Sequence, residues 1–522
     1  VFSSSDTKIA RVNSSGTVIP VSPGVAVITA RCGGQESICF VTVTKNVNYL
    51  GHNPGQEKAL RAFIKKAAAS GADISTDTDD SCYKWDEDGY LKLVFFDDIG
   101  LKGNLDFSAF TRLNTIYMYD CPDVTGIDVT GCEKLKILHI YQYDDRGSIK
   151  NIDLSGNKIL EHLVLDKQEI GEIDLSHNSE LKFISFSGLP ATSIDTGKNT
   201  KLESYMLEDM NIDSLDISGN KALKQLCLTN CEIKNTDTID VRGYASLEKM
   251  TLEGLSWLNK LYVSGCEKLT RVIATKTGLT ELDFTGCKAY EGFDPYDFGG
   301  SGIKRLKFNG CSSMKEFSYA SNFTHTELES VDLSGCTGLT ELSLPSRLFS
   351  TVDIRSFHNL RKIDIDSLPA GIITPGKYDG QYEGDIDLSG LGELREVFIS
   401  GNHIKNLKLT GVRKLKRLKA INCGIESIVF DPAGHPMLTI LETNLNDLKE
   451  FIAPDLPALR TVYLSGNNNL STIDLSGAPS LKSLSTDPIG GALKSIVLNS
   501  ALKDSAELSL TPKRIKEIIT YK

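Results

Sequence analysis

The stretch NIDLSGNKILEHLVLDKQEIGEIDLSHN, which runs from Asn151 to Asn178, contains one hexapeptide pattern twice. IDLSGN begins at Ile152 and returns as IDLSHN at Ile173, 21 residues later. Because alternate residues of a strand point to one side, the Ile and Leu of each copy share a face and the Asp points away. A pattern that returns at a short, fixed interval predicts a stack of similar coils. One coil cannot bury its apolar side alone, but a stack forms a continuous core.

The hexapeptide can be followed along most of the chain. Related versions begin at Leu105, Ile127, Ile152, Ile173, Ile194, Leu215, Ile239, Leu261, Leu282, Leu306, Val331, Val352, Ile386, Leu407, Ile428, Phe451, Ile473 and Ile496. Most intervals are 21 to 25 residues, so the sequence predicts about 18 coils. Between the hexapeptides lies a second half with Leu-x-x-Leu-x-Leu spacing, such as LEHLVLDKQEI at residues 160–170. An Asn or Cys follows at the turn, where its buried side chain can bond backbone groups of the neighbouring coil.

This nested pattern resembles the leucine-rich repeat family, in the short bacterial form with two half-repeats in each coil. The resemblance covers about residues 105–510. It implies a mainly β repeat solenoid, a curved leucine-rich repeat array of parallel strands. It also implies a binding role, although such a fold does not name its ligand.

Further segments flank the array. Residues 1–46 contain SSSDTKIARVNSSGTVIPVSPGVAVITA, which resembles the latter half of a bacterial group 2 immunoglobulin-like domain and implies an incomplete β-sandwich. Residues 47–104 are predicted to form a linker and an N-terminal cap, with an amphipathic helix over Glu57–Ala69. Residues 511–522 are predicted to be a C-terminal cap, with Thr511 as the N-cap of a helix.

Composition narrows the class of protein. The 522 residues carry a formal net charge of −11, with 40% hydrophobic and 24% charged residues, which is typical of a folded chain. An acidic chain does not favour a nucleic-acid partner, because phosphate binding needs clustered Lys and Arg. No apolar run reaches the roughly 18 residues of a transmembrane segment. The chain opens without Met, so we expect that a signal sequence or lipid anchor has been lost from the N-terminus.

Cysteine follows the repeat, since eight of the 12 cysteines occupy the turn position. These are Cys132, Cys266, Cys287, Cys311 and Cys336 in the hexapeptide half, and Cys121, Cys231 and Cys423 in the other half. A small buried side chain suits this corner, so we expect reduced structural thiols. Cys32 and Cys39 bracket the turn sequence GGQES, and a disulfide across that hairpin is the alternative there.

An Asp recurs between the two inward residues of the hexapeptide. It occupies Asp128, Asp153, Asp174, Asp195, Asp216, Asp240, Asp283, Asp332, Asp353, Asp387 and Asp474. These outward carboxylates form a file in which neighbours repel. Three arrangements would offset the repulsion: hydrogen bonds from nearby Ser and Thr, a bound calcium or other cation, or a partner with a basic surface.

The sequence contains no catalytic signature. HExxH and GxSxG are absent, so we expect no enzyme activity. An enzyme would need carboxylates converging from irregular loops, such as Asp294, Asp297 and Asp379. One acidic stretch, DTDDSCYKWDED, has carboxylates at calcium-loop positions but lacks the mid-loop Gly. The weak metal candidates in that stretch are Asp77, Asp79 and Asp88.

The repeat is interrupted by two aromatic insertions, residues 288–302 and 366–385. Insertions in a solenoid leave as loops, and loops on a rigid scaffold often bind ligands. The candidate ligand-binding residues are Tyr290, Phe293, Tyr296, Phe298, Tyr378 and Tyr382. The alternative is that these rings fold down and cover the core.

Together these features favour a non-catalytic binding or adhesion scaffold of a bacterial surface or secreted protein. We expect a monomer that needs no cofactor and binds a protein or glycan on a host or neighbouring cell. The alternative is a rigid structural stalk, stiffened by calcium along the aspartate file.

Overall fold

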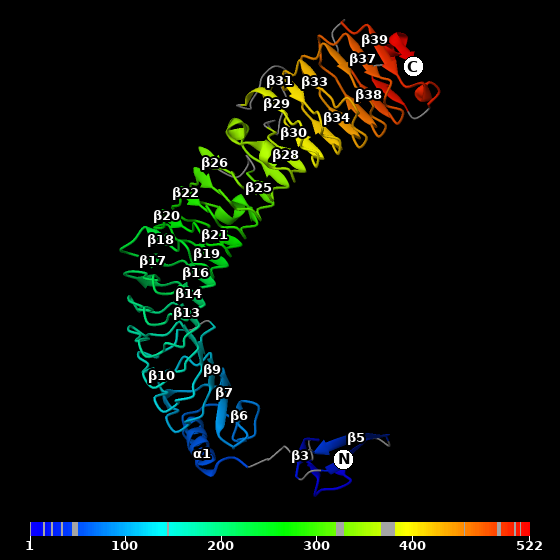
Figure 1. Cartoon of the computed structure of the whole chain (residues 1–522). Helices are drawn as coiled ribbons and strands as arrows, with labels where there is room; N and C mark the ends of the chain where they lie inside the picture. Colours follow the sequence, from blue (N-terminus) through cyan, green and yellow to red (C-terminus); the bar gives the residue numbers. More distant parts are fainter. Residues whose placement is uncertain are drawn as a thin grey trace. The chain divides into compact units, whose positions relative to one another are not determined.

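The computed structural model describes residues 2–13, 16–21, 24–32, 35–43, 51–143, 146–319, 328–366, 382–453, 455–487, 492–505, 508–511 and 513–522. The chain divides into two compact units, Val1–Leu202 and Glu203–Lys522. Both units contain turns of one type of mainly β parallel solenoid, about 18 in all, and a small helix lies near the N-terminus (Figure 1). The predicted repeat solenoid is confirmed.

In the first unit, one sheet carries the second half of each repeat. Its strands are β6 (Tyr83–Trp85), β7 (Leu91–Asp97), β9 (Thr115–Tyr119), β11 (Ile137–Tyr141), β12 (His162–Asp166) and β13 (Phe183–Ser187). β6 pairs antiparallel with β7, and each later strand adds in parallel. Leu138 and Ile140 of β11 are buried, whereas His139 between them faces outward. The alternation of buried and outward residues therefore follows the period of a strand.

The hexapeptide half forms a looser ladder in this unit. β8 (Gly103–Asp106) pairs in parallel with β10 (Val124–Asp128), and single bridges join Ile127 to Ile152 and Ile173 to Ile194. The leucines of the two opening hexapeptides, Leu154 and Leu175, are 2% and 1% exposed. They belong to the core, as the pattern predicts.

The second unit repeats this arrangement with parallel pairing throughout its described strands. The second-half strands are β14 (Ser204–Glu208), β16 (Gln225–Thr229), β19 (Lys249–Glu253), β21 (Arg271–Ile273), β23 (Gly292–Phe293), β25 (Glu316–Ser318), β27 (Glu341–Ser343), β28 (Lys362–Asp364), β30 (Glu396–Phe398), β32 (Arg417–Lys419), β34 (Ile440–Glu442), β36 (Thr461–Tyr463), β38 (Ser483–Ser485) and β40 (Ser509–Thr511). The hexapeptide strands are β18 (Thr238–Asp240), β20 (Lys260–Tyr262), β22 (Glu281–Asp283), β24 (Arg305–Lys307), β26 (Ser330–Asp332), β29 (Glu383–Asp387), β31 (His403–Lys408), β33 (Ser427–Val429), β35 (Glu450–Ile452), β37 (Thr472–Leu475), β39 (Ser495–Leu498) and β41 (Ile519–Tyr521).

Shorter elements complete the second unit. They are the strands β15 (Asn211–Ile212) and β17 (Glu232–Ile233) and the 3-10 helices η1 (Pro295–Phe298), η2 (Ser346–Thr351), η3 (Ile354–Ser356), η4 (Ser500–Leu502) and η5 (Lys513–Ile518). At the C-terminus, the predicted helix is a short 3-10 helix, η5, and the chain then adds β41 to β39 in parallel. The prediction of Thr511 as the N-cap of this helix is wrong, because Thr511 is the last residue of β40. β41 therefore extends the parallel sheet, because the backbone groups at the open edge of β39 can pair with one more strand.

The N-terminal cap contains the helix α1 (Pro54–Ala69), which begins three residues before the predicted start. Asn53 caps it by accepting hydrogen bonds from the backbone N–H groups of Gly55 and Gln56. Leu60, Ile64 and Ala67 are buried along one side of α1, as the periodicity predicts. In the described part of the chain, no helix is both long and apolar enough to cross a membrane.

The segment before α1 is antiparallel. β1 (Phe2–Ser4), β4 (Gly24–Cys32) and β5 (Gln35–Val43) form one sheet, and β2 (Ala10–Val12) pairs with β3 (Val18–Pro20). A small core of Ala10, Ala26, Ile28 and Val43 joins them. The assignment of this segment to the immunoglobulin-like family stays a prediction.

The hairpin register bears on the alternative disulfide. Cys32 lies opposite Gln35, and Cys39 lies opposite Ile28. Four residues along a strand correspond to about 13 Å, which exceeds the backbone separation that a disulfide spans. The register therefore argues against a bridge between the two cysteines.

Candidate functional site

The first predicted loop packs into the core of the second unit. Tyr290, Phe293 and Phe298 are 1%, 2% and 4% exposed. The ring of Tyr290 lies 4.3 Å from that of Phe284, and the rings of Phe293 and Phe298 stack at 5.2 Å. Tyr296 alone among the four faces solvent, with 62% of its surface exposed. The loop thus covers the core with three of its aromatic rings.

The second predicted loop is described only in part. Tyr378 lies outside the described residues, as does Asp379. The Tyr382 hydroxyl donates to the Asp385 carbonyl at 2.7 Å, and its ring packs edge-on against Phe349. Ligand binding by these two loops stays a prediction, and it gains little support from rings that contact the core.

The carboxylates considered for catalysis have structural partners. Asp294 caps η1 by accepting from the Tyr296 N–H at 2.9 Å. Asp297 pairs with the Arg271 guanidinium at 2.8 Å. Each of the two carboxylates thus has a structural partner in the second unit.

Each of the three weak metal candidates contacts a different partner. Asp79 pairs with His52 at 3.0 Å, and Asp88 pairs with Arg112 at 2.6 Å. Asp77 accepts from the Asp79 N–H and closes a local turn. Within the described ranges, no three His, Cys, Asp or Glu side chains lie together as a metal site.

The repeated aspartates close local turns. In each case Oδ1 accepts the backbone N–H two residues later, as from Ser155 to Asp153 and from Ser176 to Asp174, both at 2.9 Å. Hydrogen bonds from the Ser hydroxyl, and then from its N–H, hold the pKa of both aspartates below the usual value. Local hydrogen bonding thus offsets the repulsion along the file, which was the first of the three arrangements considered.

The strongest candidate lies elsewhere, on the outward side of the sheet in the first unit. We call this surface the aromatic face. It consists of Phe95, Tyr117, Tyr119, His139, Tyr141, Tyr143, His162 and Phe183. These residues come from β7, β9, β11, β12 and β13, except Tyr143, which follows β11.

Strand register assembles the aromatic face. Parallel pairing sets Phe95 beside Tyr117 and Tyr117 beside His139, and it sets Tyr119 beside Tyr141. All are outward positions, because the residues between them are buried. Side chains one strand apart in a parallel sheet are direct neighbours, so the rings form a continuous surface.

The rings contact each other in chains. Phe95 lies 5.6 Å from Tyr119, which lies 6.2 Å from Tyr141, and Tyr141 lies 5.7 Å from Tyr143. Phe95, Tyr141 and Tyr143 are 39%, 40% and 52% exposed. Single exposed rings are common on protein surfaces, whereas contiguous groups of exposed rings are less so.

His139 lies inside this group. Its Nε2 atom is buried and has no hydrogen-bond partner among the described residues, and its ring meets that of Tyr117 edge-on at 5.1 Å. Burial, followed by the nearby His162, lowers the pKa of His139 to about 4. The imidazole is therefore neutral at neutral pH and behaves as part of the aromatic surface.

The carboxyl ends of the strands add negative charge to one edge of the face. Asp97 ends β7, and the Tyr143 hydroxyl reaches its Oδ1 atom at 3.5 Å. Burial, the neighbouring Tyr117 and Tyr143, and the Asp97 charge raise the pKa of Tyr119 above its usual value. Burial and Asp97 do the same for Tyr143, so both phenols stay protonated at neutral pH.

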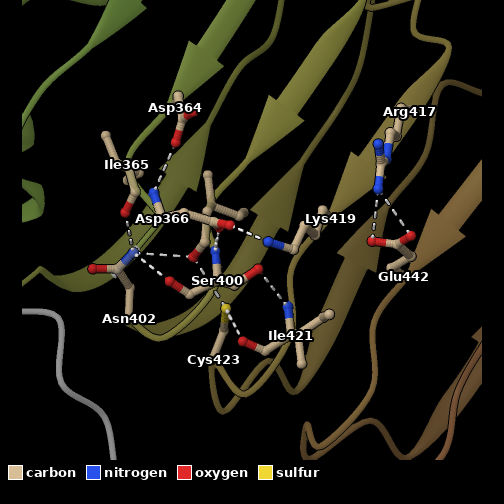
Figure 2. A network of polar contacts seen from close by, with 11 residues as sticks. Asp364, Ile365, Asp366, Ser400, Asn402, Arg417, Lys419, Ile421, Cys423 and Glu442 are labelled. Carbon is tan, nitrogen blue, oxygen red and sulfur yellow. Dashed lines mark hydrogen bonds and ion pairs between the residues drawn. The ribbon is translucent and has the colours of Figure 1, made fainter. Parts of the chain in front are cut away.

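Outward positions on β28 and β32 in the second unit are charged by contrast. Figure 2 shows Lys419 paired with Asp366, and Arg417 paired with Glu442 at 3.1 Å. Burial raises the pKa of Asp364 in the same network. Two of the cations in this part of the sheet, Arg417 and Lys419, are thus already paired within the chain.

The aromatic face was not among the predicted sites, although the sequence contains a signal for it. Phe95, Tyr117 and His139 follow each other at intervals of 22 residues, as Asp97, Tyr119 and Tyr141 do. Aligning the second halves of the coils, and not only the hexapeptides, would have placed these residues side by side.

Comparisons with known proteins concern the fold alone. No family model and no curated protein matches the sequence. Among solved structures, the functional domain of InlJ from Listeria monocytogenes, which includes a cysteine ladder, is 18% identical, covers 77% of this chain and 74% of its own, and has a TM-score of 0.35. An internalin, InlF, from the same organism is 12% identical over 88% of this chain and 98% of its own, with a TM-score of 0.32. The leucine-rich repeat protein LIC12759 of Leptospira interrogans is 13% identical over 80% and 93%, with a TM-score of 0.33.

Proposed function

We propose that this chain is a non-catalytic binding scaffold whose aromatic face holds a protein partner. The observation that carries the proposal is the contiguous group of outward rings on β7, β9, β11, β12 and β13. Large rigid rings gain binding free energy at little cost in side-chain entropy, which is why Tyr and Trp dominate binding hot spots. A parallel sheet holds such rings in fixed positions before a partner arrives.

The rest of the proposal follows the expectations from the sequence. The scaffold works as part of a bacterial surface or secreted protein, which the leucine-rich and immunoglobulin-like resemblances support. It carries out no catalysis, since Asp294 and Asp297 serve a helix cap and an ion pair. A protein is favoured over a glycan because the exposed rings adjoin each other over several strands, which suits a broad apolar contact.

An array of purified extracellular proteins and glycans tests the proposal. The wild-type chain is compared with the double variant Phe95→Ala/Tyr141→Ala and with Tyr262→Ala, an exposed Tyr on β20 that serves as the matched control. We expect a protein spot that binds the wild type and the control alike. The double variant should bind it about 10-fold or more weakly, as expected for hot-spot residues.

Thermal unfolding of all three chains checks that the variants keep the fold. Equal binding by the double variant would contradict the proposal. Binding restricted to glycan spots would replace the protein partner by a glycan, and an array without any bound spot would favour the rigid stalk.

A further inference from the structure

Resting on the proposed function, we propose that the occupant of the aromatic face is a basic protein segment whose Lys or Arg side chain contacts Tyr119, Tyr141 and Tyr143 beside Asp97. The commitment to a basic partner comes from charge complementarity at the carboxyl ends of β7, β9 and β11. We call this edge of the aromatic face the acidic corner. It consists of Asp97, Asp98, Asp120, Tyr119, Tyr141 and Tyr143.

Three carboxylates gather at this edge because parallel strands end on the same side. Asp97 is the last residue of β7, and Asp98 and Asp120 occupy the left-handed turns that follow β7 and β9, with φ of 47° and 48°. The N–H of Asp98 donates to Tyr119 and that of Asp120 to Tyr141, which fixes both turns against the next strand. Burial raises the pKa of Tyr143, and the backbone holds the carboxylates of Asp97 and Asp120 close enough to raise it further.

Within the described part of the first unit, no Lys or Arg forms an ion pair with these three carboxylates. The nearby Lys167 ammonium donates to the Tyr143 carbonyl, and Lys102 pairs with Asp123. By contrast, the amino ends of the strands carry Lys136 and Lys182, which already share Glu161 at 2.6 and 2.7 Å. The face is therefore polarised, with unmatched negative charge at one edge only.

The rings and carboxylates suit the same ligand group. The face of a Tyr ring attracts a cation electrostatically, and Arg also stacks on it through its planar guanidinium. Tyr141 meets Tyr119 and Tyr143 edge-on, at 6.2 and 5.7 Å, so neighbouring rings in this corner face different directions. A carboxylate within the same corner adds a charge-assisted hydrogen bond. An acidic or neutral segment would bury the Asp97 carboxylate without a cation to pair with it.

The test uses two peptides that carry fluorescein on the N-terminal amine, fluorescein-Arg-Gly-Arg-Gly-Arg-amide and the same peptide with citrulline in place of Arg. Citrulline keeps the shape and removes the charge. Anisotropy titrations compare the wild-type chain with Asp97→Asn/Asp120→Asn and with Tyr143→Ala. The Asn substitutions keep the size, and Asn tolerates the left-handed turn at residue 120.

A charge-matched control separates the corner from the general acidity of the chain. Glu316→Gln/Glu341→Gln removes the same charge from neighbouring outward positions of β25 and β27. We expect both corner variants to bind the Arg peptide about 10-fold more weakly than the wild type does. The control should weaken it less than about 2-fold, and the citrulline peptide should bind the wild type as weakly as the corner variants bind Arg.

Equal weakening by the control and the corner variants would overturn the inference, as would equal binding of the two peptides. Titration with the protein identified on the array distinguishes this failure from a failure of the proposed function. If that partner loses affinity for Phe95→Ala/Tyr141→Ala but not for Asp97→Asn/Asp120→Asn, the aromatic face binds and the basic segment is wrong. If neither variant changes its affinity, both proposals fail.

Discussion

At the scale of single residues, the buried turn position decides how coils are joined. The Asn178 side-chain amide donates to the carbonyls of Leu154 and Asn157 in the preceding coil, at 3.0 and 2.9 Å. A Cys at the equivalent position makes one contact, as Cys287 Sγ does to the Val263 carbonyl at 3.2 Å. Burial raises the pKa of the Cys287 thiol to about 12, so it stays protonated and can donate. Each residue type satisfies a carbonyl that would otherwise be buried without a partner.

Asn178→Ala should lower the free energy of unfolding by about 2–4 kcal/mol, because two buried carbonyls lose their donor. Asn178→Cys should cost less, since the thiol restores one contact. Hydrogen exchange of β12 and β13 measures the effect locally, with exposed Glu172→Ala as the control. Unchanged protection in Asn178→Ala would show that the ladder bonds contribute nothing to stability.

At the scale of elements, ion pairs between successive coils hold the amino ends of the strands. Glu161, which immediately precedes β12, lies between Lys136 and Lys182 of the neighbouring coils. Hydrogen bonds from the two ammonium groups lower the pKa of Glu161 from 4.5 to about 2. A carboxylate with a depressed pKa stabilises the fold above the pKa of the unfolded chain and loses that contribution as the pH falls through its folded value.

Glu161→Gln should therefore destabilise the protein by about 1 kcal/mol at pH 7, a value kept small because the lysines are exposed to solvent. The difference from wild type should persist down to about pH 4.5 and vanish as the pH falls through about 2. Denaturation midpoints across this range give the measurement, with Glu172→Gln as the charge control. A stability difference between wild type and Glu161→Gln that grows as the pH falls would contradict the lowered pKa of Glu161.

At the scale of the whole molecule, the aspartate file distinguishes a hydrogen-bonded solenoid from a calcium-stabilised stalk. Along the chain, residues such as Asp128, Asp283 and Asp474 each accept the N–H two residues later, at 3.0, 2.9 and 2.9 Å. Calcium needs six to eight oxygen ligands, and one oxygen of each carboxylate is already engaged in its own turn. Regular spacing by itself is therefore insufficient for calcium sites.

We expect calcium and magnesium to change the thermal midpoint of the chelator-treated protein equally, through screening of its net negative charge. Thermal unfolding with each cation at matched ionic strength measures this. A midpoint raised by calcium alone would support the stalk, and it would require carboxylates to leave their turns.

The sequence by itself determined the coil, its period and its inward face. Hydrophobic residues at strand spacing and an Asn or Cys at the turn define each coil locally, and every coil repeats this pattern of residues. The helix near residues 57–69 followed for the same reason, because helical periodicity is local. Eight ladder cysteines and the hydroxyl-bonded aspartates could likewise be anticipated from their place in the repeat.

Only the tertiary structure decided which outward side chains lie next to each other. The sequence shows that Tyr119 and Tyr141 point outward, but register between parallel strands is what brings them together with Asp97 and Tyr143. The predicted binding loop over residues 288–302 behaves differently. Tyr290, Phe293 and Phe298 fold onto the core, because burying these rings lowers the free energy more than exposing them does. The order of residues determines on which face of a strand a side chain lies. Its neighbours on that face depend on how the strands of successive coils pair.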